Sequence, residues 1–434
     1  MADKKDFHHD IVNSPRLGKG GRTPRKVVIY SSNGSANYDL RIQSQACFLE
    51  AKGFSVTVIE PTPASLCEPF DWSSFGITYI SEEVNATQSQ SLAKAIAALR
   101  VAREANRRKW ISRVVVNLAI WIVKILCIAN ARAVRRAVFC KLQALQPSVI
   151  ITRDIIPQEI LWFQKRYPDT RIVTDMHEVV FWQEGAVNEK LRAAQFSAFK
   201  TISAAVCVTE EVRTSFYSDI GKPVFVIPNA PSSLLCKNVE FNSRAHEGHT
   251  LFLIHGGYLA ARDFLVDVIC EVWSKTPESA VLCVRMLNQL DIHHLARRHQ
   301  KMPRILFLPS VHGGFQEELK RTAGLFDIGI LPIPTNVSPM YTMCSPNRLA
   351  LYLHAGLGIL HTPSCFVDEI GARSKAGSRW DGSEIATFVR SVQELARSRE
   401  RVEALRRSAL DFAKTEYVYE CYGQPLADLI ASRW

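Results

Sequence analysis

Residues 26–59 have the sequence KVVIYSSNGSANYDLRIQSQACFLEAKGFSVTVI, and this stretch decides the fold class. It opens with a β-branched run at 26–30 and closes with a second such run at 54–59. A loop of small and polar residues and a helix-like stretch at 40–52 lie between the two runs. Two strands joined by a loop and a helix over about thirty residues are typical of the unit that opens a Rossmann-like parallel sheet.

The same alternation of apolar runs and helical segments continues along the chain and divides it into two halves. A polar stretch at 232–249 has no apolar periodicity, and the pattern restarts at Thr250. A chain of 434 residues also exceeds what one hydrophobic core usually serves. We therefore predict an α/β protein with two Rossmann-like domains, at 26–231 and 250–412, joined by a linker. The further strand-like runs are 149–152, 171–174, 205–208 and 224–227, then 250–254, 280–284, 305–308, 327–331 and 358–361.

The composition is that of a globular protein from a reducing compartment. Hydrophobic residues make up 47% of the chain and charged residues 22%, which supplies apolar material for two cores. The 11 cysteines are odd in number and include no C-x-x-C pair, so we expect neither a disulfide framework nor a zinc ribbon. Residues 1–25 are polar and basic and contain no apolar signal core, so we expect a flexible tail on a cytoplasmic protein.

The charge balance favours polyanionic partners. Lys and Arg number 53 against 42 Asp and Glu, which gives a net charge of +11. Phosphate-bearing substrates, anionic lipid and nucleic acid all fit this sign. Because no recognition-helix, RNP or zinc-finger pattern accompanies the cations, we expect no nucleic-acid partner.

One segment, 100–141, combines an apolar run with basic flanks and is expected to be helical. Residues 114–129 (VVVNLAIWIVKILCIA) are almost wholly apolar, but these sixteen residues, interrupted by Asn117 and Lys124, fall short of the ~20 that a spanning helix needs. A wide apolar face bordered by cations is what an interfacial helix on an anionic bilayer requires. A buried core helix with solvated ends is the alternative. The residues assigned to the membrane surface are Trp110, Trp121, Arg107, Arg108 and Lys109.

Three ionisable side chains follow the strand-like run RIVT. Asp175, His177 and Glu178 stand at the edge where open α/β sheets place their ligands. His177 can donate to a substrate hydroxyl, and a nearby carboxylate can orient it or act as a base. An acidic surface loop with a satisfied histidine explains the same residues equally well, so both interpretations stay open.

Two loops of the first half are candidates to border a ligand. The loop around Gly34, between the first strand and helix, presents backbone N–H groups to an anionic or hydroxylated ligand, although a simple turn explains it almost as well. Asn229 lies in the rigid turn VIPNAP, which we interpret as a hinge at the domain junction.

In the second half, the strand TLFLI runs into two glycines that suit a phosphate site. Gly256 and Gly257 have no side chains to keep a pyrophosphate away from the backbone. Arg262 stands where the next helix should begin, and there its charge opposes the helix dipole. A clamp on phosphate groups gives this arginine a reason.

A second helix entry, CSPNRLALYLHAGLG at 344–358, has a polar first turn on an apolar helix. Ser345 and Pro346 precede this helix, and Asn347 and Arg348 fall in its first turn, where they would face the ligand. Good helix capping is the simpler interpretation of the same pattern.

The succession DMHE, VIPNAP, HGG with Arg262, FDIGILPI, SPNRL and AGLG resembles the GT-B glycosyltransferases, especially those similar to glycosyltransferase family 4 that build bacterial surface polysaccharides. The likeness covers most of 26–434. It implies two Rossmann-like domains that face each other across a cleft, with the nucleotide-sugar on the second domain and the acceptor on the first. It also implies that a C-terminal helix within 413–434 returns to the first domain.

The resemblance assigns roles to the candidate residues. Arg348 stands where the family usually has a lysine at the diphosphate, His177 would contact the transferred sugar, and the loop 309–311 would receive the nucleobase. Such enzymes need no metal, so we expect neither a metal site nor a cofactor. The donor residues are then Gly256, Gly257, Arg262, Ser310, Val311, Ser345, Asn347 and Arg348, while Gly34 and Asn229 border the substrate cleft.

The sequence departs from the family at the donor. Two glutamates eight positions apart are common there, one of them binding the ribose, and this chain has Met343 and Leu351 at those positions. Asp263 and Gly358 also replace a usual glycine and a usual proline. The retaining stereochemistry of the family is therefore not assumed, and an inverting reaction with Asp175 or Glu178 as base stays open.

We predict a glycosyltransferase that acts on a membrane-associated, lipid-linked acceptor in surface polysaccharide synthesis, peripheral on the inner face of the cell membrane. The missing glutamates motivate an alternative, a catalytically silent GT-B scaffold that partners an active enzyme. A dinucleotide oxidoreductase is the weakest hypothesis, because neither half has the glycine fingerprint with a strand-end acidic residue.

Overall fold

The computed structural model describes most of the two predicted domains. The described residues are 24–31, 36–37, 39–60, 70–81, 136–154, 156–179, 181–183, 186–237, 239–241, 248–257, 264–311, 314–334, 339–382 and 384–432. Within them, no helix is both long enough and apolar enough to cross a membrane. The apolar run 114–129 lies outside these ranges, so its predicted membrane role stays a prediction.

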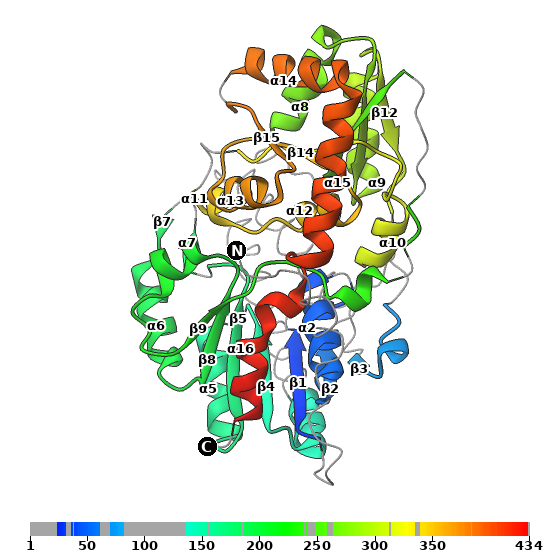
Figure 1. Cartoon of the computed structure of the whole chain (residues 1–434). Coiled ribbons are helices and arrows are strands. Elements are labelled where there is room, and N and C mark those ends of the chain that lie inside the picture. The colour runs from blue at the N-terminus through cyan, green and yellow to red at the C-terminus, as the bar shows by residue number, and fades with distance from the viewer. Residues whose placement is uncertain are drawn as a thin grey trace, which may run out of the picture.

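The first domain is built on a seven-stranded sheet in which all neighbouring strands are parallel (Figure 1). The strand order is β3-β2-β1-β4-β5-β8-β9, so the direction of progression along the chain reverses between β1 and β4. The strands are β1 (Lys26–Ser31), β2 (Ser55–Glu60), β3 (Thr78–Ser81), β4 (Val149–Arg153), β5 (Arg171–Met176), β8 (Ala204–Cys207) and β9 (Val224–Val226).

Two layers of helices bury the two faces of this sheet. Alternate strand residues such as Val27 and Ile29 join one core cluster with α2 (Leu40–Ala51) and α16 (Tyr419–Ala431), whereas Val28 joins another with helices of the opposite face. This period of two along buried strands is what packing on both faces requires. The helices of the opposite face are α5 (Pro157–Arg166), α6 (Glu189–Phe199) and the helical residues 136–145.

The second domain repeats the design with six parallel strands in the order β12-β11-β10-β13-β14-β15. Here the progression reverses between β10 and β13. The strands are β10 (Thr250–Gly256), β11 (Ala280–Met286), β12 (Ile305–Leu308), β13 (Ile328–Leu331), β14 (Gly358–His361) and β15 (Gly377–Arg379).

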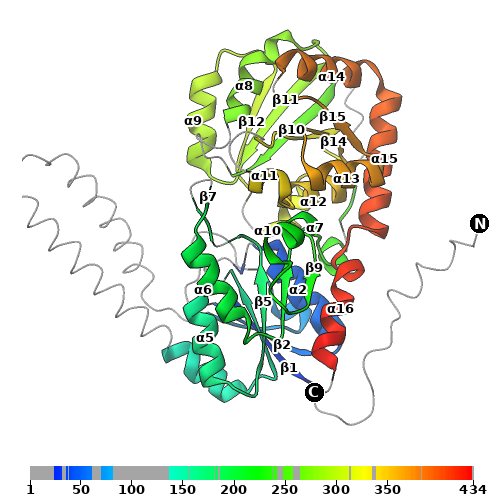
Figure 2. The ribbon, with the colours of Figure 1, turned by 90° about the vertical axis from the view of Figure 1, so that its left-hand side faces the viewer.

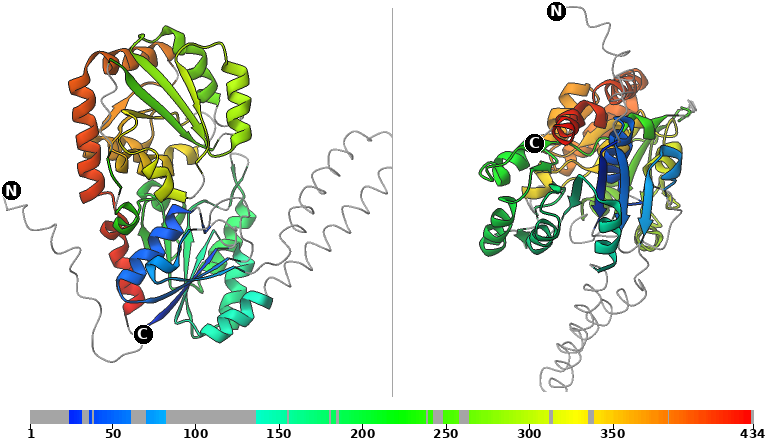
Figure 3. Two further views of the ribbon diagram at one scale, coloured as in Figure 1. Left: turned by 90° about the vertical axis from the view of Figure 1, so that its right-hand side faces the viewer. Right: turned by 90° about the horizontal axis from the view of Figure 1, so that it is seen from below.

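Helices also cover both faces of the second sheet (Figure 3). One face packs α8 (Phe264–Val272), α9 (Gln289–His299) and α14 (Ile385–Arg397) against strand residues such as Phe252 and Ile254. On the other face, Leu253 and its neighbours pack against α10 (Gly314–Lys320), α12 (Asn347–His354) and α13 (Cys365–Ser374). Short elements lie in both domains. The first domain contains β6 (Trp182–Gln183), β7 (Ala186–Val187) and α7 (Glu210–Val212), and the second contains α11 (Pro339–Met343). The predicted α/β fold with two Rossmann-like domains is confirmed.

The last two helices connect the domains along one side of the molecule. In Figure 1, α15 (Arg399–Thr415) runs down the second domain and continues into α16, which lies on the first. Two arginines fix the far end of α16 because they donate to its free carbonyl oxygens. Arg25 Nη1 bonds the oxygen of Ser432 at 2.8 Å, and Arg171 Nη1 bonds that of Leu429 at 2.7 Å.

The carboxyl ends of the two sheets face each other (Figure 2). Thr209 follows β8 of the first sheet, and its hydroxyl donates to the carbonyl oxygen of Met343, in α11 of the second domain, at 2.7 Å. Asn229, beyond β9, donates its backbone N–H to Ser345 Oγ at 3.0 Å. Since open α/β sheets bind ligands at the carboxyl edge beside the reversal of strand order, the two ligand edges are brought together.

Candidate functional site

A buried ion pair organises the carboxyl edge of the first sheet. Asp39 caps α2 by accepting the backbone N–H of Arg41 at 2.9 Å, which places Arg41 in the first turn of the helix. Its guanidinium reaches Asp175, at the end of β5, with Nε 2.8 Å from both carboxylate oxygens and Nη2 2.7 Å from one. Both side chains are buried, so the carboxylate of Asp175 is committed to Arg41.

Asp154 holds the loop that carries His177. It follows β4 in the left-handed region, with φ of 42°, and its Oδ1 accepts the backbone N–H groups of His177 at 2.8 Å and Glu178 at 2.9 Å. Arg153 pairs with Asp154 at 3.3 Å and also with Asp39. Burial raises the pKa of Asp154 to about 6. A non-glycine residue in this strained conformation marks a position where the surrounding structure dictates the backbone.

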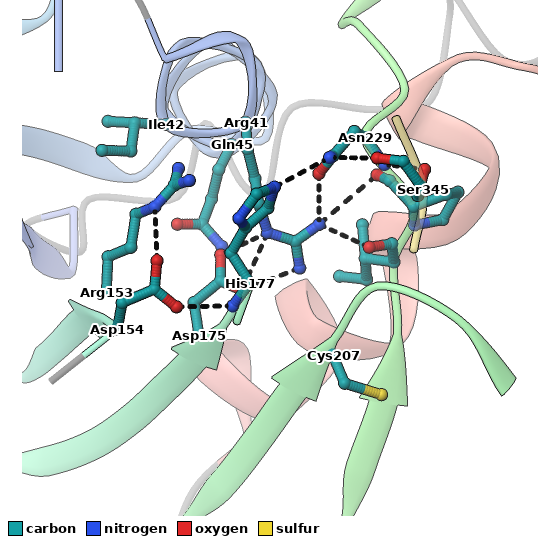
Figure 4. A network of polar contacts seen from close by, with 12 residues as sticks. Arg41, Ile42, Gln45, Arg153, Asp154, Asp175, His177, Cys207, Asn229 and Ser345 are labelled. Atoms are coloured by element: carbon teal, nitrogen blue, oxygen red, sulfur yellow. Dashed lines mark hydrogen bonds and ion pairs between the residues drawn. The ribbon is translucent and has the colours of Figure 1, made fainter. Parts of the chain in front are cut away.

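His177 lies between the two domains and is uncharged. Its Nε2 is 3.0 Å from Nδ2 of Asn229, whose Nδ2 is also 2.5 Å from the carbonyl oxygen of Ser345 (Figure 4). Burial and the nearby cations Arg153 and Arg41 lower the pKa of His177 to about 3. The imidazole is therefore neutral at neutral pH.

The second sheet contributes a glycine under an arginine. Gly256 ends β10 with φ of 137°, and a Cβ atom added there would lie 2.8 Å from Cδ of Arg348. Any larger residue would displace this side chain, so the glycine lets the arginine cross the strand end. Arg348 belongs to the first turn of α12, which starts at Asn347 and has no side-chain cap. Among the described residues, no carboxylate forms an ion pair with Arg348.

Residues at the ends of β10 and β12 add polar groups to this edge of the sheet. His255 Nε2 lies 3.0 Å from Glu318 of α10, and the backbone N–H of His255 donates to the hydroxyl of Tyr352 at 2.9 Å. Beyond β12, the backbone N–H of Ser310 donates to Gln289, whereas its buried Oγ has no hydrogen-bond partner among the described residues. Val311 is buried next to it. A helix terminus, glycines and an arginine without an ion pair in the described part of the chain together suit an anion.

No protein-family model matches the chain, and no curated protein matches its sequence. Solved structures do match it. It is similar to sucrose-phosphate synthase from Thermosynechococcus elongatus, with a TM-score of 0.61, 10% identity, and 93% of this chain and 98% of that chain covered. It is also similar to WaaG, a glycosyltransferase involved in lipopolysaccharide biosynthesis, with a TM-score of 0.57, 14% identity and coverage of 94% and 100%. The chain has the GT-B fold.

A third GT-B neighbour has a bound donor. Anabaena HepE, in complex with UDP-glucose, has a TM-score of 0.57 and 10% identity, with 94% of this chain and 100% of that chain covered. At identities this low, the structural matches show a shared fold and no more. The reaction has to be inferred from the site itself. Membership in glycosyltransferase family 4 stays a prediction.

The structure brings together most of the predicted residues that it describes. His177, Asn229 and Ser345 form one hydrogen-bonded chain, and Gly256 meets Arg348. Gly257, Asn347 and Glu178 are exposed beside them. Gly34, Arg262 and the five membrane-surface residues, Trp110, Trp121, Arg107, Arg108 and Lys109, lie outside the described residues, so their roles stay predictions.

The positions of the two missing glutamates are occupied by packed apolar side chains. Leu351 is 1% exposed in the core of α12, and Met343 packs against the core of the first domain. A GT-B enzyme that lacks both carboxylates must bind a ribose through other groups. Glu318 is one carboxylate that the described residues bring to this edge, through its contact with His255.

Arg41, Arg153 and Asp154 are not among the residues predicted from the sequence. Asp154 could have been found, because it stands two residues after the strand-like run at 149–152 and therefore at the same sheet edge as Asp175. Arg41 gave no such signal, since it lies within a helix and its partner is 134 residues away in the sequence.

Removing the charge of Asp175 tests whether this pair anchors the first domain. In Asp175→Asn, Arg41 stays buried without its counter-charge, so we expect the unfolding free energy of the first domain to fall by about 3–5 kcal/mol. Urea unfolding followed by circular dichroism measures the loss. The double variant Arg41→Met/Asp175→Leu removes both charges and should recover most of it. Equal losses in the single and double variants would contradict the anchoring role.

Proposed function

We propose that this protein is a glycosyltransferase that moves a sugar from a nucleotide-sugar to an acceptor on the first domain. One observation carries the proposal: His177 of the first domain is bonded through Asn229 to Ser345, which stands two residues before the helix α12 that carries Arg348. A donor whose diphosphate rests on the start of α12 has its sugar directed toward His177. Transfer between groups held on facing domains then needs no large rearrangement.

The second domain, which we call the donor half, suits a diphosphate without a metal. The start of α12 has positive helix polarity and no side-chain cap, Gly257 is exposed just beyond β10, and Arg348 has no competing carboxylate among the described residues. Arg262, by its predicted place, adds a second cation. HepE, which has this fold, has been solved with UDP-glucose and with UDP, and these complexes support the same class of donor here.

The first domain supplies a neutral hydrogen-bond donor for the transferred sugar. Because His177 is uncharged, it polarises a sugar hydroxyl without placing a full positive charge beside it. Asp175 is bound to Arg41 and unsuited to take up a proton, whereas the exposed Glu178 is a carboxylate that an acceptor hydroxyl could reach. We therefore assign Asp175 to support of the site.

We further propose that the acceptor is lipid-linked and that the enzyme works at the inner face of the cell membrane. WaaG and the lipopolysaccharide outer core galactosyltransferase WaaB, both of this fold, support a role in surface polysaccharide synthesis. The net charge of +11 and the basic flanks of the apolar run 114–129 suit an anionic bilayer.

A second candidate is a silent GT-B scaffold that partners an active enzyme. The apolar residues Met343 and Leu351 at the positions of the two glutamates favour it, since a donor site without ribose contacts loses affinity. The two candidates differ in turnover of the donor.

Replacing Arg348 tests the donor site. We expect one nucleoside diphosphate to raise the melting temperature of the wild-type protein and Arg348→Ala to abolish most of that rise, because a charge-assisted bond to phosphate is lost. A thermal-shift screen against nucleoside diphosphates and nucleotide-sugars measures both. The matched control is Arg390→Ala, an exposed arginine on α14 away from either sheet edge. An equal rise in all three proteins would contradict the assignment.

The membrane proposal has a separate test. Replacing Trp121 and Ile125 by aspartate puts charges into the apolar run, so the double variant should no longer sediment with vesicles of anionic phospholipid. Leu290→Asp is the control, because Leu290 is 73% exposed on the second domain and outside the run. Unchanged sedimentation of the double variant would overturn the membrane role.

A further inference from the structure

The amide of Asn229 bridges a ring nitrogen and a backbone carbonyl. Figure 4 shows the amide between Ser345 and His177, and its Nδ2 lies 2.5 Å from the carbonyl oxygen of Ser345 and 3.0 Å from Nε2 of His177. Its Oδ1 is 3.5 Å from Nη1 of Arg41, which can only donate. The backbone N–H of Asn229 also donates to Ser345 Oγ at 3.0 Å. The side chain of Asn229 therefore contacts both domains, and its backbone N–H adds a second contact with Ser345 of the second domain.

The chemistry of these neighbours fixes the protonation state of His177. A carbonyl oxygen only accepts, so the amide atom facing Ser345 has to be the NH₂ group, and the oxygen has to face Arg41. That NH₂ group has two hydrogens, one for Ser345 and one for His177. Because it donates to Nε2, this ring nitrogen has to carry a lone pair. A neutral imidazole with a bare Nε2 has its proton on Nδ1.

We infer that Asn229 is a positioning residue that holds His177 as the neutral Nδ1–H tautomer and makes this state depend on contact with the second domain. For its meaning in catalysis the inference rests on the proposed function. Nδ1–H is then the ring's hydrogen-bond donor, and among the described residues no protein acceptor lies within reach of it. This N–H is free to bind a hydroxyl of the transferred sugar.

The charged groups around His177 act in the same direction. Arg41 of α2 and Arg153 of β4 oppose a positive imidazolium, and Asp175 of β5, which would favour it, is already paired with Arg41. Asp154 binds the backbone N–H of His177 and not its ring. Protonation of Nε2 would set two N–H groups against each other and break the contact of Asn229 with the histidine.

The same contact couples the histidine to the donor half. Ser345 lies immediately before Pro346, the residue that caps α12, and Arg348 belongs to the first turn of that helix. A shift of α12 away from the first domain removes the carbonyl that orients the amide. The amide then keeps only its 3.5 Å contact with Arg41, so the tautomer of His177 is held less firmly. The ring is therefore set for transfer most firmly while the second domain is docked.

Nitrogen NMR of the full chain tests the tautomer directly. With ¹⁵N-labelled histidine, the two ring signals of His177 are those lost in the spectrum of His177→Gln. At pH 7 we expect an unprotonated Nε2 and a protonated Nδ1 in the wild-type protein. A protonated Nε2 in the wild-type protein would overturn the inference, and this measurement requires no variant of Asn229 to fold.

Two variants then test the role of the amide. In Asn229→Asp the carboxylate only accepts, so the proton should move to Nε2 and the pKa of His177 should rise by about 1–3 units. Ser345→Ala removes the hydroxyl and leaves the carbonyl, so the Nδ1–H tautomer should persist. An unprotonated Nε2 in Asn229→Asp at pH 7, or a changed tautomer in Ser345→Ala, would each contradict the assignment.

Turnover separates this inference from the proposed function. If the protein transfers sugar, Asn229→Asp should lose kcat at pH 7, with the KM for the donor unchanged, because its Nδ1 no longer carries the hydrogen that binds the sugar. It should regain part of that kcat as pH falls through the raised pKa of His177, because an imidazolium carries a proton on both ring nitrogens, whereas the wild-type protein shows no such ionisation above about pH 4. A protein that turns over no nucleotide-sugar at all would contradict the proposed function, and the NMR result would still decide the tautomer.

Discussion

The pairing of Arg41 with Asp175 is the constraint on which the rest of the site depends. It joins the first turn of α2 to the end of β5, and the same guanidinium donates to the carbonyl of Ile227, directly after β9. Two charges are expensive to bury, and only a multiply bonded geometry offsets that cost. The arrangement holds together the start of α2, the end of β5 and the chain that leads to the second domain. The positions of His177 and Asn229 therefore depend on it.

The two chain crossings between the domains are joined to each other. Tyr419, where α16 begins, donates its backbone N–H to the carbonyl of Pro231, directly before the linker, at 2.8 Å. The carboxylate of Glu420 accepts from the hydroxyl of Ser232 at 2.7 Å and from the backbone N–H of Ser233 at 3.0 Å. A motion of the second domain therefore acts on both crossings together. Contacts at the sheet edges, above all that of Asn229 with Ser345, are the ones such a motion would change.

The strands could largely be predicted from sequence because buried parallel strands are short apolar runs. The run at 149–152 became β4, and the run at 358–361 became β14. The edge strand β15 escaped notice because its sequence is GSR, without an apolar residue, and the edge strand β3 was missed because none of its four residues is fully buried. The site followed the same rule. His177 and Glu178, which follow β5, were found from their place after a strand, and the same rule applied to β4 leads to Asp154. Arg41 depends on a pairing between distant segments that no local pattern contains.

The release of nucleoside diphosphate from nucleotide-sugars, measured in the presence of EDTA, tests the central claim most directly. The wild-type protein should release the nucleotide from one donor without added metal. His177→Gln should bind that donor as well as the wild-type protein does and turn it over about 10²–10³-fold more slowly, because one hydrogen-bond donor to the reacting sugar is lost. A wild-type protein that binds the nucleotide and never releases it from any sugar would contradict the account.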